Sequence, residues 1–152
     1  MSRSIKIEGT EELVKAFKKL TREAAIEVGK AIDATGLSLR GSIVKKYQRG
    51  PATGITYEKT NPKRTHKASA AGEAPATDTG RLANSVVTEK DAASPLSIEV
   101  LTEVEYGPYL EFGTRTIAPR PSWVPSVQEE TPKYIRRVEA AIRRAAIRRA
   151  AR

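Results

Sequence analysis

The chain has 152 residues, 39% of them hydrophobic, which is enough for one domain with a modest core but not for two. It has no cysteine and a single histidine, His66, which excludes disulfide bonds, thiolate metal sites and metal sites shared by two histidines. It has no apolar run of about eighteen residues and no secretory signal at its start, so we expect no membrane insertion and a protein kept in the cytoplasm where it is made.

The net charge of +9 is concentrated at one end of the chain. Residues 131–152 contain eight lysines or arginines and one acid, Glu139, which gives +7 and leaves only +2 for the other 130 residues. The basic character therefore belongs to a C-terminal segment, and the rest of the protein is nearly neutral.

The first third of the chain predicts a short strand followed by helices. The stretch "SIKI" alternates apolar and polar residues, and "EELVKAFKKL" has the acidic start and basic end of a helix. A long amphipathic helix should then run to about Tyr47, because apolar or small residues recur every three or four positions at Ala24, Val28, Ala31, Ile32, Thr35, Leu39 and Ile43. Gly29 and Gly36 lie near one face of it, which favours close packing there.

Residues 48–79 show neither helical nor strand periodicity. They are rich in Gly, Pro, Thr, Ser and Lys, and Ile55 and Tyr57 are almost their only large apolar residues. A segment of about thirty residues without structure of its own is usually a binding segment or disordered. We therefore expect an extended loop that is mobile in the isolated protein.

Regular structure is predicted again after this loop. Asp78 or Thr79 can cap one helical turn, after which "SVVTEK" has the β-branched content of a strand. In "SPLSIEVLTEVEY", Leu96, Ile98, Val100 and Thr102 alternate with residues of the opposite face. The two segments, joined by "KDAASP", predict an antiparallel hairpin.

The stretch "EYGPYLEFGTRTIAPRPSWVP" leads into the last predicted helix. "YGPYLEFG" fits a turn and a short helix ending at Gly113, and the prolines up to Pro125 delay regular structure until about Ser126. The apolar stripe of the final helix is expected at Ile135, Val138, Ala141, Ile142 and Ala145 or Ala146. The predicted fold is α+β: a single domain over residues 1–152, with a small antiparallel β-sheet packed against a long N-terminal helix, a basic C-terminal helix over residues 131–152 and a long mobile loop over residues 48–79.

No group of residues suggests catalysis. Glu103, Glu105 and Glu111 are close in sequence but have no reason to converge, and are interpreted as solvated carboxylates. Ser122 and Ser126 lack a nearby histidine, and Ser122 is better explained as a helix cap. We predict that the protein is not an enzyme and has no catalytic, cofactor-binding or metal-binding residues.

Two features leave alternatives open. The aromatic segment can be a cap on the core, with Tyr109 and Phe112 on one helical face, or a stiff binding loop whose residue types match interface hot spots. The arginines of the last helix can shield an alanine-rich stripe or contact an acidic partner or the phosphates of DNA. The arginines available for such contacts are Arg136, Arg137, Arg143, Arg144, Arg148 and Arg149.

The ordered motifs "GEAPATDTGRLANSV", "VEYGPYLEFGT" and "APRPSWVPSV" resemble the head-tail joining, or neck and tail-completion, proteins of long-tailed bacteriophages. The motifs run from about Gly72 to Val127, and the flanking helices extend the resemblance over most of the chain. Gly107 stands where alanine is frequent in that family, and Trp123 where phenylalanine is frequent. The motif positions are Thr79, Gly80, Leu82, Ser85, Tyr106, Tyr109, Glu111, Phe112, Gly113, Arg120, Pro121 and Trp123.

The resemblance implies a structural virion protein of the neck or upper tail, assembled in the host cytoplasm, without cofactor or catalytic residues. Its partners would be copies of itself in a ring of sixfold symmetry or a multiple, neighbouring head-completion and tail proteins, and DNA passing through the ring. Two alternatives are a tail terminator protein and a small basic nucleic-acid-binding protein that uses its C-terminal helix.

Overall fold

A computed structural model describes residues 4–7, 22–91 and 93–150 of the chain. The helix predicted over "EELVKAFKKL" lies outside the described residues. The described elements are β1 (Ser4–Ile7), α2 (Arg22–Arg49), β2 (Thr56–Thr60), β3 (Lys63–Lys67), α3 (Arg81–Asn84), β4 (Val86–Lys90), β5 (Ile98–Thr102), α4 (Gly107–Phe112) and α5 (Trp123–Ala150). None of the described helices is long and apolar enough to cross a membrane.

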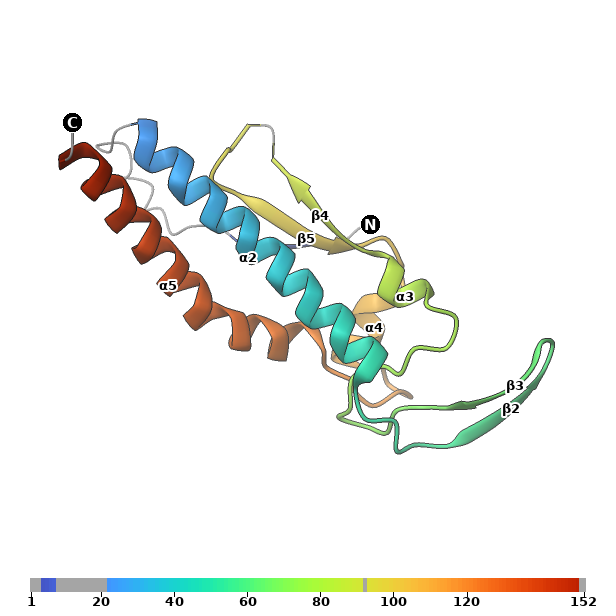
Figure 1. Cartoon of the computed structure of the whole chain (residues 1–152). Coiled ribbons are helices and arrows are strands. Elements are labelled where there is room, and N and C mark those ends of the chain that lie inside the picture. Colours follow the sequence, from blue (N-terminus) through green and yellow to red (C-terminus); the bar gives the residue numbers. More distant parts are fainter. Residues whose placement is uncertain (1–3, 8–21, 92, 151–152) are drawn as a thin grey trace.

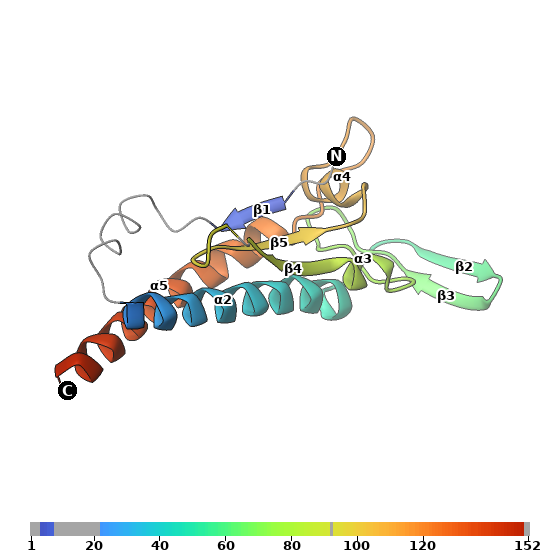
Figure 2. The ribbon, with the colours of Figure 1, turned by 90° about the horizontal axis from the view of Figure 1, so that it is seen from above.

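The architecture is a small sheet laid on a pair of long helices (Figures 1 and 2). The strands are ordered β1-β5-β4, all antiparallel, and the β4–β5 pair has the register Thr88 opposite Val100. Helix α2 contacts both β4 and β5, and α5 packs along α2. This confirms the predicted α+β fold, with the sheet on the long helix, and confirms the predicted β4–β5 hairpin.

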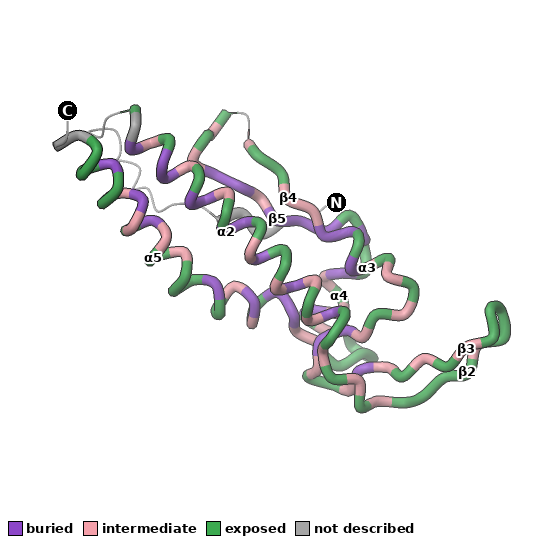
Figure 3. Tube along the Cα trace, viewed as in Figure 1, coloured by how far each residue is buried: buried purple, intermediate pink, exposed green. Residues whose placement is uncertain are grey.

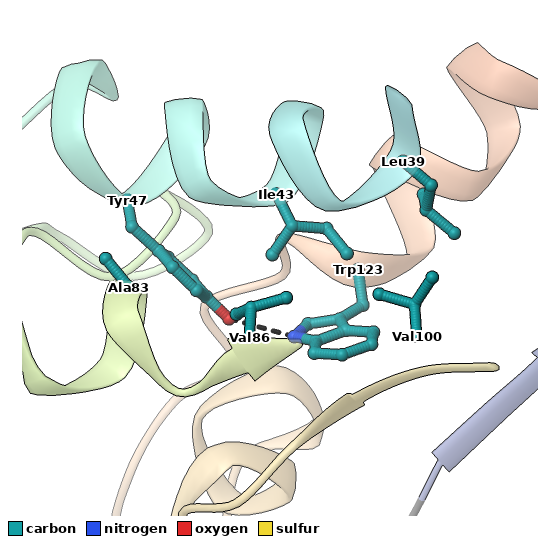
Figure 4. Packing of buried hydrophobic residues seen from close by; sticks show 7 residues of the cluster. All are labelled: Leu39, Ile43, Tyr47, Ala83, Val86, Val100 and Trp123. Carbon is teal, nitrogen blue, oxygen red and sulfur yellow. Dashed lines mark hydrogen bonds between the residues drawn. The ribbon is translucent and has the colours of Figure 1, made fainter. Parts of the chain in front are cut away.

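The core lies between α2, the sheet and α5 (Figure 3). All seven residues of the predicted α2 stripe, from Ala24 to Ile43, are buried. One cluster joins Val28, Ala31 and Ile32 of α2 to β5 and α5 through Ile98, Val138 and Ala141. A second cluster contains Leu39, Ile43, Tyr47, Ala83, Val86, Val100 and Trp123 (Figure 4).

Glycine allows α2 to approach the sheet closely. A β-carbon at Gly36 would lie 2.5 Å from Cδ1 of Ile98 and 2.9 Å from its Cγ2, closer than side chains tolerate. One at Gly29 would lie 3.4 Å from the carbonyl oxygen of Pro95. The predicted close packing at these two glycines is confirmed. At Gly36 the helix could not lie this close to Ile98 if the residue had a side chain.

The expectation of a structureless loop over residues 48–79 is wrong. Strands β2 and β3 form an antiparallel hairpin that projects from the body (Figures 1 and 2). The rest of the segment is tied down by hydrogen bonds: the Thr77 amide donates to the Tyr47 carbonyl at 3.0 Å, and Glu73 accepts from the Thr53 amide at 3.0 Å and the Ala70 amide at 2.8 Å. These partners are distant in sequence or polar, so no hydrophobic periodicity signals them.

Helix α5 begins at Trp123 rather than near Ser126, and it includes Pro125 and Pro132. Pro125 lies in the first turn, where amides have no partner inside the helix. Pro132 removes one internal hydrogen bond, and the helix bends in its N-terminal half (Figure 1). The buried stripe is Val138, Ala141 and Ala145, whereas Ile135 is 50% exposed, so its predicted place in the stripe is wrong.

Candidate interaction surface

The Glu111 carboxylate caps the start of α5. Its Oε2 accepts the amides of Ser122 at 2.7 Å and Trp123 at 3.0 Å, and its Oε1 accepts the Val124 amide at 2.8 Å. Such charge-assisted bonds satisfy amides that a helix start leaves unpaired, and they place a negative charge at the positive end of the helix dipole. The interpretation of Glu111 as a solvated carboxylate is therefore wrong, because the residue is only 7% exposed.

Ser122 stands just before the helix, as expected of a cap residue, and its carbonyl accepts the Ser126 amide at 3.2 Å. Its hydroxyl, however, donates to Glu111 Oε2 at 3.1 Å and lies 3.2 Å from the Tyr47 hydroxyl, rather than accepting the helix amides. The carboxylate that performs the capping comes from eleven residues earlier in the chain, which is why a local sequence pattern does not reveal it.

Trp123 anchors this junction in the core. Its indole nitrogen donates to the Tyr47 hydroxyl at 2.8 Å, and its ring packs among Leu39, Val86 and Val100 (Figure 4). Burial raises the pKa of Tyr47 above its ordinary value, because the core does not solvate the phenolate, although the hydrogen bonds from Ser122 and Trp123 act in the opposite direction. Of the four aromatic residues of the segment, only Trp123 fulfils the expected core role.

The other three aromatic residues point outward. Phe112 is 69% exposed, Tyr109 59% and Tyr106 39%, so the alternative in which Tyr109 and Phe112 cap the core is wrong. Ile117 and Val124, also exposed, are close in sequence to the same segment. We call Tyr106, Tyr109, Phe112, Ile117 and Val124 the aromatic patch.

A tight turn after α4 holds this segment in shape. Gly113 has φ of 76°, and a β-carbon there would lie 2.7 Å from the Ile117 carbonyl oxygen, so only glycine fits. The Thr114 amide donates to that carbonyl at 2.8 Å. Arg120 then ties the segment to α4, because its amide donates to the Leu110 carbonyl at 2.7 Å. Its guanidinium group donates to the Ser69 hydroxyl at 3.2 Å and so ties the segment to the loop that follows β3.

The motif around α3 supports the same end of the fold. Gly80, with φ of 81°, is the N-cap residue of the helix and has no side chain, and the Thr79 hydroxyl accepts the amide of Arg81, the first helical residue, at 3.4 Å, as the prediction for Thr79 expects. Leu82 packs on the second core cluster, and the Ser85 hydroxyl bonds the Leu82 carbonyl and the Thr102 hydroxyl, each at 2.8 Å. Asp78 instead pairs with Lys59 and Arg64 of the hairpin.

Several predicted motif residues meet around one hollow of about 250 Å³ at the root of the hairpin. Its lining includes Thr79, Gly80, Leu82, Tyr106 and Arg120 from three separate motifs. Glu111 and Trp123 lie on the buried side of the segment, Pro121 is half-buried, and Tyr109 and Phe112 lie on the outside. The motif residues thus form one structural unit with a buried anchor and an exposed surface.

The arginines of α5 divide into two groups. Arg137 bonds Glu130 and Ser38 at 3.2 and 3.1 Å, and Arg144 and Arg148 lie 3.6 and 3.0 Å from the Glu27 carboxylate. These three fasten α5 to α2. Arg136 and Arg143 are exposed, and no ion pair is found for them within residues 22–91 and 93–150. The side chain of Arg149 lies outside the description.

No cluster of three or more His, Cys, Asp or Glu that could hold a metal occurs in the described part of the chain. The single histidine, His66, lies on the hairpin and faces Asp78, with 3.8 Å between His66 Nδ1 and Asp78 Oδ1. What stands out is a rigid segment that exposes aromatic side chains next to its buried anchor.

Comparison with known proteins gives one family. Residues 8–113 match the sequence model of the HK97-gp10-like family, described as "Bacteriophage HK97-gp10, putative tail-component". Neither curated proteins nor solved structures gave a significant match. The match covers more than two thirds of the chain and ends at Gly113, directly after the exposed turn of α4.

Proposed function

Since the chain belongs to the HK97-gp10-like family of phage tail components, we propose that it builds the head-tail neck or tail-completion region as a ring of identical subunits. Membership of this family makes it a structural phage protein, in keeping with the absence of a catalytic constellation from its sequence. The ring would have sixfold symmetry or a multiple and would join head and tail with DNA passing through it.

The aromatic patch carries this proposal. A subunit that worked alone would gain nothing from exposing Phe112, Tyr109 and Tyr106 on a segment that glycine, proline and Glu111 hold rigid. Exposed aromatic clusters mark protein interfaces, and a segment that is already ordered loses little entropy on binding. We therefore assign the aromatic patch to contacts with a neighbouring subunit or an adjoining neck protein.

The arginines suit a ring around DNA. Arg136 and Arg143 are exposed on α5 and form no ion pair with any residue of the described ranges 22–91 and 93–150, and the body of the protein is nearly neutral. Phosphate contacts by such residues hold DNA without reading its sequence, which is what a passage for any genome segment needs.

Electron microscopy and light scattering of the purified protein, with and without head and tail components, test the ring. Phe112→Ala should leave the free energy of unfolding within about 0.5 kcal/mol but weaken assembly, because the side chain is exposed. Trp123→Ala should cost about 3–5 kcal/mol of stability, because the side chain is 6% exposed.

Leu37→Ala is the matched control, since Leu37 is 59% exposed on α2 outside the aromatic patch, and it should alter neither property. A protein that stays monomeric with every partner and never enters the virion would disprove the proposal. Assembly that is indifferent to Phe112→Ala would show that the aromatic patch is not the interface.

A further inference from the structure

The β2–β3 hairpin has one attached face and one bare face. Lys59, Arg64 and His66 are half-buried and face Asp78, with 2.7 Å between Arg64 Nη2 and Asp78 Oδ1. The other face is fully exposed along both strands, at Thr56, Glu58, Thr60, Lys63, Thr65 and Lys67. The hairpin is thus tethered to the body but not buried by it.

An isolated two-stranded hairpin is at best marginally stable in water, and a projecting one leaves a row of unpaired backbone groups along each outer edge. Figures 1 and 2 show both edges of the hairpin clear of the rest of the described chain. A strand that pairs with either edge would satisfy those groups. The hairpin therefore projects as an arm whose outer edges can each pair with a further strand.

The same chain carries a sheet edge of matching length. Strand β4 is the outermost strand of the β1-β5-β4 sheet, and its five residues equal the five of β3. Apart from its pairing with β5, the backbone of β4 receives one hydrogen bond from the described residues: Arg40 Nε donates to the Val86 carbonyl at 2.7 Å. The turn from β4 to β5 lies far from the hairpin (Figure 1).

The hairpin and the segment that contains β4 and β5 carry opposite net charge. Residues 55–68, which form the hairpin, contain Lys59, Lys63, Arg64 and Lys67 against Glu58, a net charge of +3. Residues 86–105, which include β4, β5, the turn between them and the three residues after β5, contain five aspartates or glutamates against Lys90, a net charge of −4, and Glu89 is the acid within β4 itself. Complementary charge of this kind selects partner and register.

From these observations we propose that the hairpin of one subunit docks on the outer edge of β4 in a second copy of this chain and extends its sheet. Because the arm and the receiving edge lie at different places, the contact joins unlike surfaces, and repetition of it closes a ring. The inference rests on the proposed ring and names the contact that builds it.

The charges also set the register. Glu89 lies on the face of β4 opposite to the core, beside Val87, and both Lys63 and Lys67 lie on the bare face of the hairpin beside Thr65. Lys63 opposite Glu89 in an antiparallel pairing, or Lys67 opposite Glu89 in a parallel pairing, puts Thr65 opposite Val87, because side chains on one face are two residues apart. The other two placements put Thr65 opposite Asp91, which lies beyond the end of β4. Thr65 and Val87 are therefore the pair to test.

Cysteine cross-linking measures this pairing directly, because the chain has no cysteine of its own. The full-length double variant Thr65→Cys and Val87→Cys, oxidised in the assembled state, should give a ladder of covalent oligomers, since opposite residues of paired strands lie within disulfide reach. The control pair Thr65→Cys and Glu139→Cys places the second cysteine on exposed α5 and should give none.

Charge reversal provides the second readout. Lys63→Glu with Lys67→Glu should weaken self-association about tenfold, and Glu89→Lys added to it should restore much of the loss. The melting temperature of the free subunit should stay unchanged in both variants, because the three substituted side chains are exposed.

The outcomes separate this inference from the proposed function. Rings that form without the Thr65–Val87 cross-link, and that tolerate the lysine reversal, would overturn the docking of the hairpin and leave the ring standing. A protein that never self-associates would overturn both. If the lysine reversal instead abolishes salt-dependent binding of a DNA fragment while rings persist, the arm contacts DNA and the docking is wrong.

Discussion

Glu111 shows how one buried charge is kept at low cost. Its carboxylate receives three backbone amides and the Ser122 hydroxyl, so both oxygens are engaged. A buried carboxylate without such partners would be strongly unfavourable, but here the donors are amides that the start of α5 leaves without internal partners. The residue therefore stabilises two elements at once, although nothing near it in sequence indicates this.

Replacing Glu111 by Gln should lower the free energy of unfolding by about 1–3 kcal/mol, because the charge is lost and an NH₂ group must face backbone donors. Denaturant unfolding followed by circular dichroism measures this. Glu105→Gln is the control, since Glu105 is exposed, and it should stay within about 0.5 kcal/mol. Equal effects for the two variants would show that the cap contributes nothing.

Asp78 makes the attachment of the hairpin dependent on pH. The hydrogen bond from Lys59, with the nearby charges of Arg64 and Lys59, lowers the pKa of Asp78. A carboxyl with a lowered folded pKa contributes stability that is full above its unfolded pKa, about 3.9, and is lost as the pH falls through the folded value.

Protection of the hairpin amides from hydrogen exchange, corrected for intrinsic rates, should therefore drop below about pH 4. In Asp78→Asn the protection should be weak already at neutral pH and should change little on acidification. A wild-type hairpin equally protected at pH 3 and pH 6 would contradict the tether.

At the scale of elements, the helices were predictable from sequence and the hairpin was not. The α2 stripe is visible because its apolar residues repeat with the helical period and meet a core. Strands β2 and β3 consist of "TYEKT" and "KRTHK", which have no apolar alternation, because neither face of the hairpin meets the core. Its shape depends on Asp78, which lies eleven residues beyond β3.

The candidate interaction surface, too, was predictable from sequence only in part. The motif positions of the aromatic segment were identified from sequence, and they do gather at one end of the fold. Their orientation could not be predicted, because Tyr109, Phe112 and Trp123 are chemically similar and only the contact with Tyr47 distinguishes the anchor from the exposed rings. Periodicity does not encode a contact between residues 76 positions apart.

Helix α2 offers two glycines with opposite expected effects. Gly36→Ala should destabilise the protein by about 1 kcal/mol or more, because crowding of the buried Ile98 side chain outweighs the gain in helix propensity. Gly41→Ala faces open space and should stabilise it by about 0.5–1 kcal/mol. Thermal unfolding of both variants decides the matter, and stabilisation by both would refute the close packing at Gly36.

At the scale of the whole molecule, the net charge of +9 overstates how much positive charge is available to partners. Glu27 of α2 pairs with Arg144 and Arg148, and Arg137 pairs with Glu130 of its own helix while it bonds Ser38 of α2. Truncating the chain after Glu139 would thus be a poor test of DNA contact, because it also removes Ala141 and Ala145 from the core. Substitution separates the two roles.

Arg136→Gln with Arg143→Gln should leave stability unchanged and reduce the slope of log K against log salt concentration for DNA binding by about 2, one unit for each lost phosphate contact. Fluorescence anisotropy with a labelled duplex at several salt concentrations gives the slope. Arg144→Gln with Arg148→Gln, which loses the pairs to Glu27, is the contrasting variant. An unchanged slope in the first variant would place α5 away from DNA.

The Glu111 cap has a mechanical consequence. Helix α5 has 28 residues and so a contour of about 42 Å, and its first turn is fastened directly to α4, with no slack chain at the junction. Force applied at Phe112 therefore passes through Glu111 into the axis of this rod rather than being absorbed by a flexible loop. A force that a bound neighbour exerts on the subunit at Phe112 would therefore be transmitted along α5 to its C-terminal end. The helix would bend most easily at Pro132.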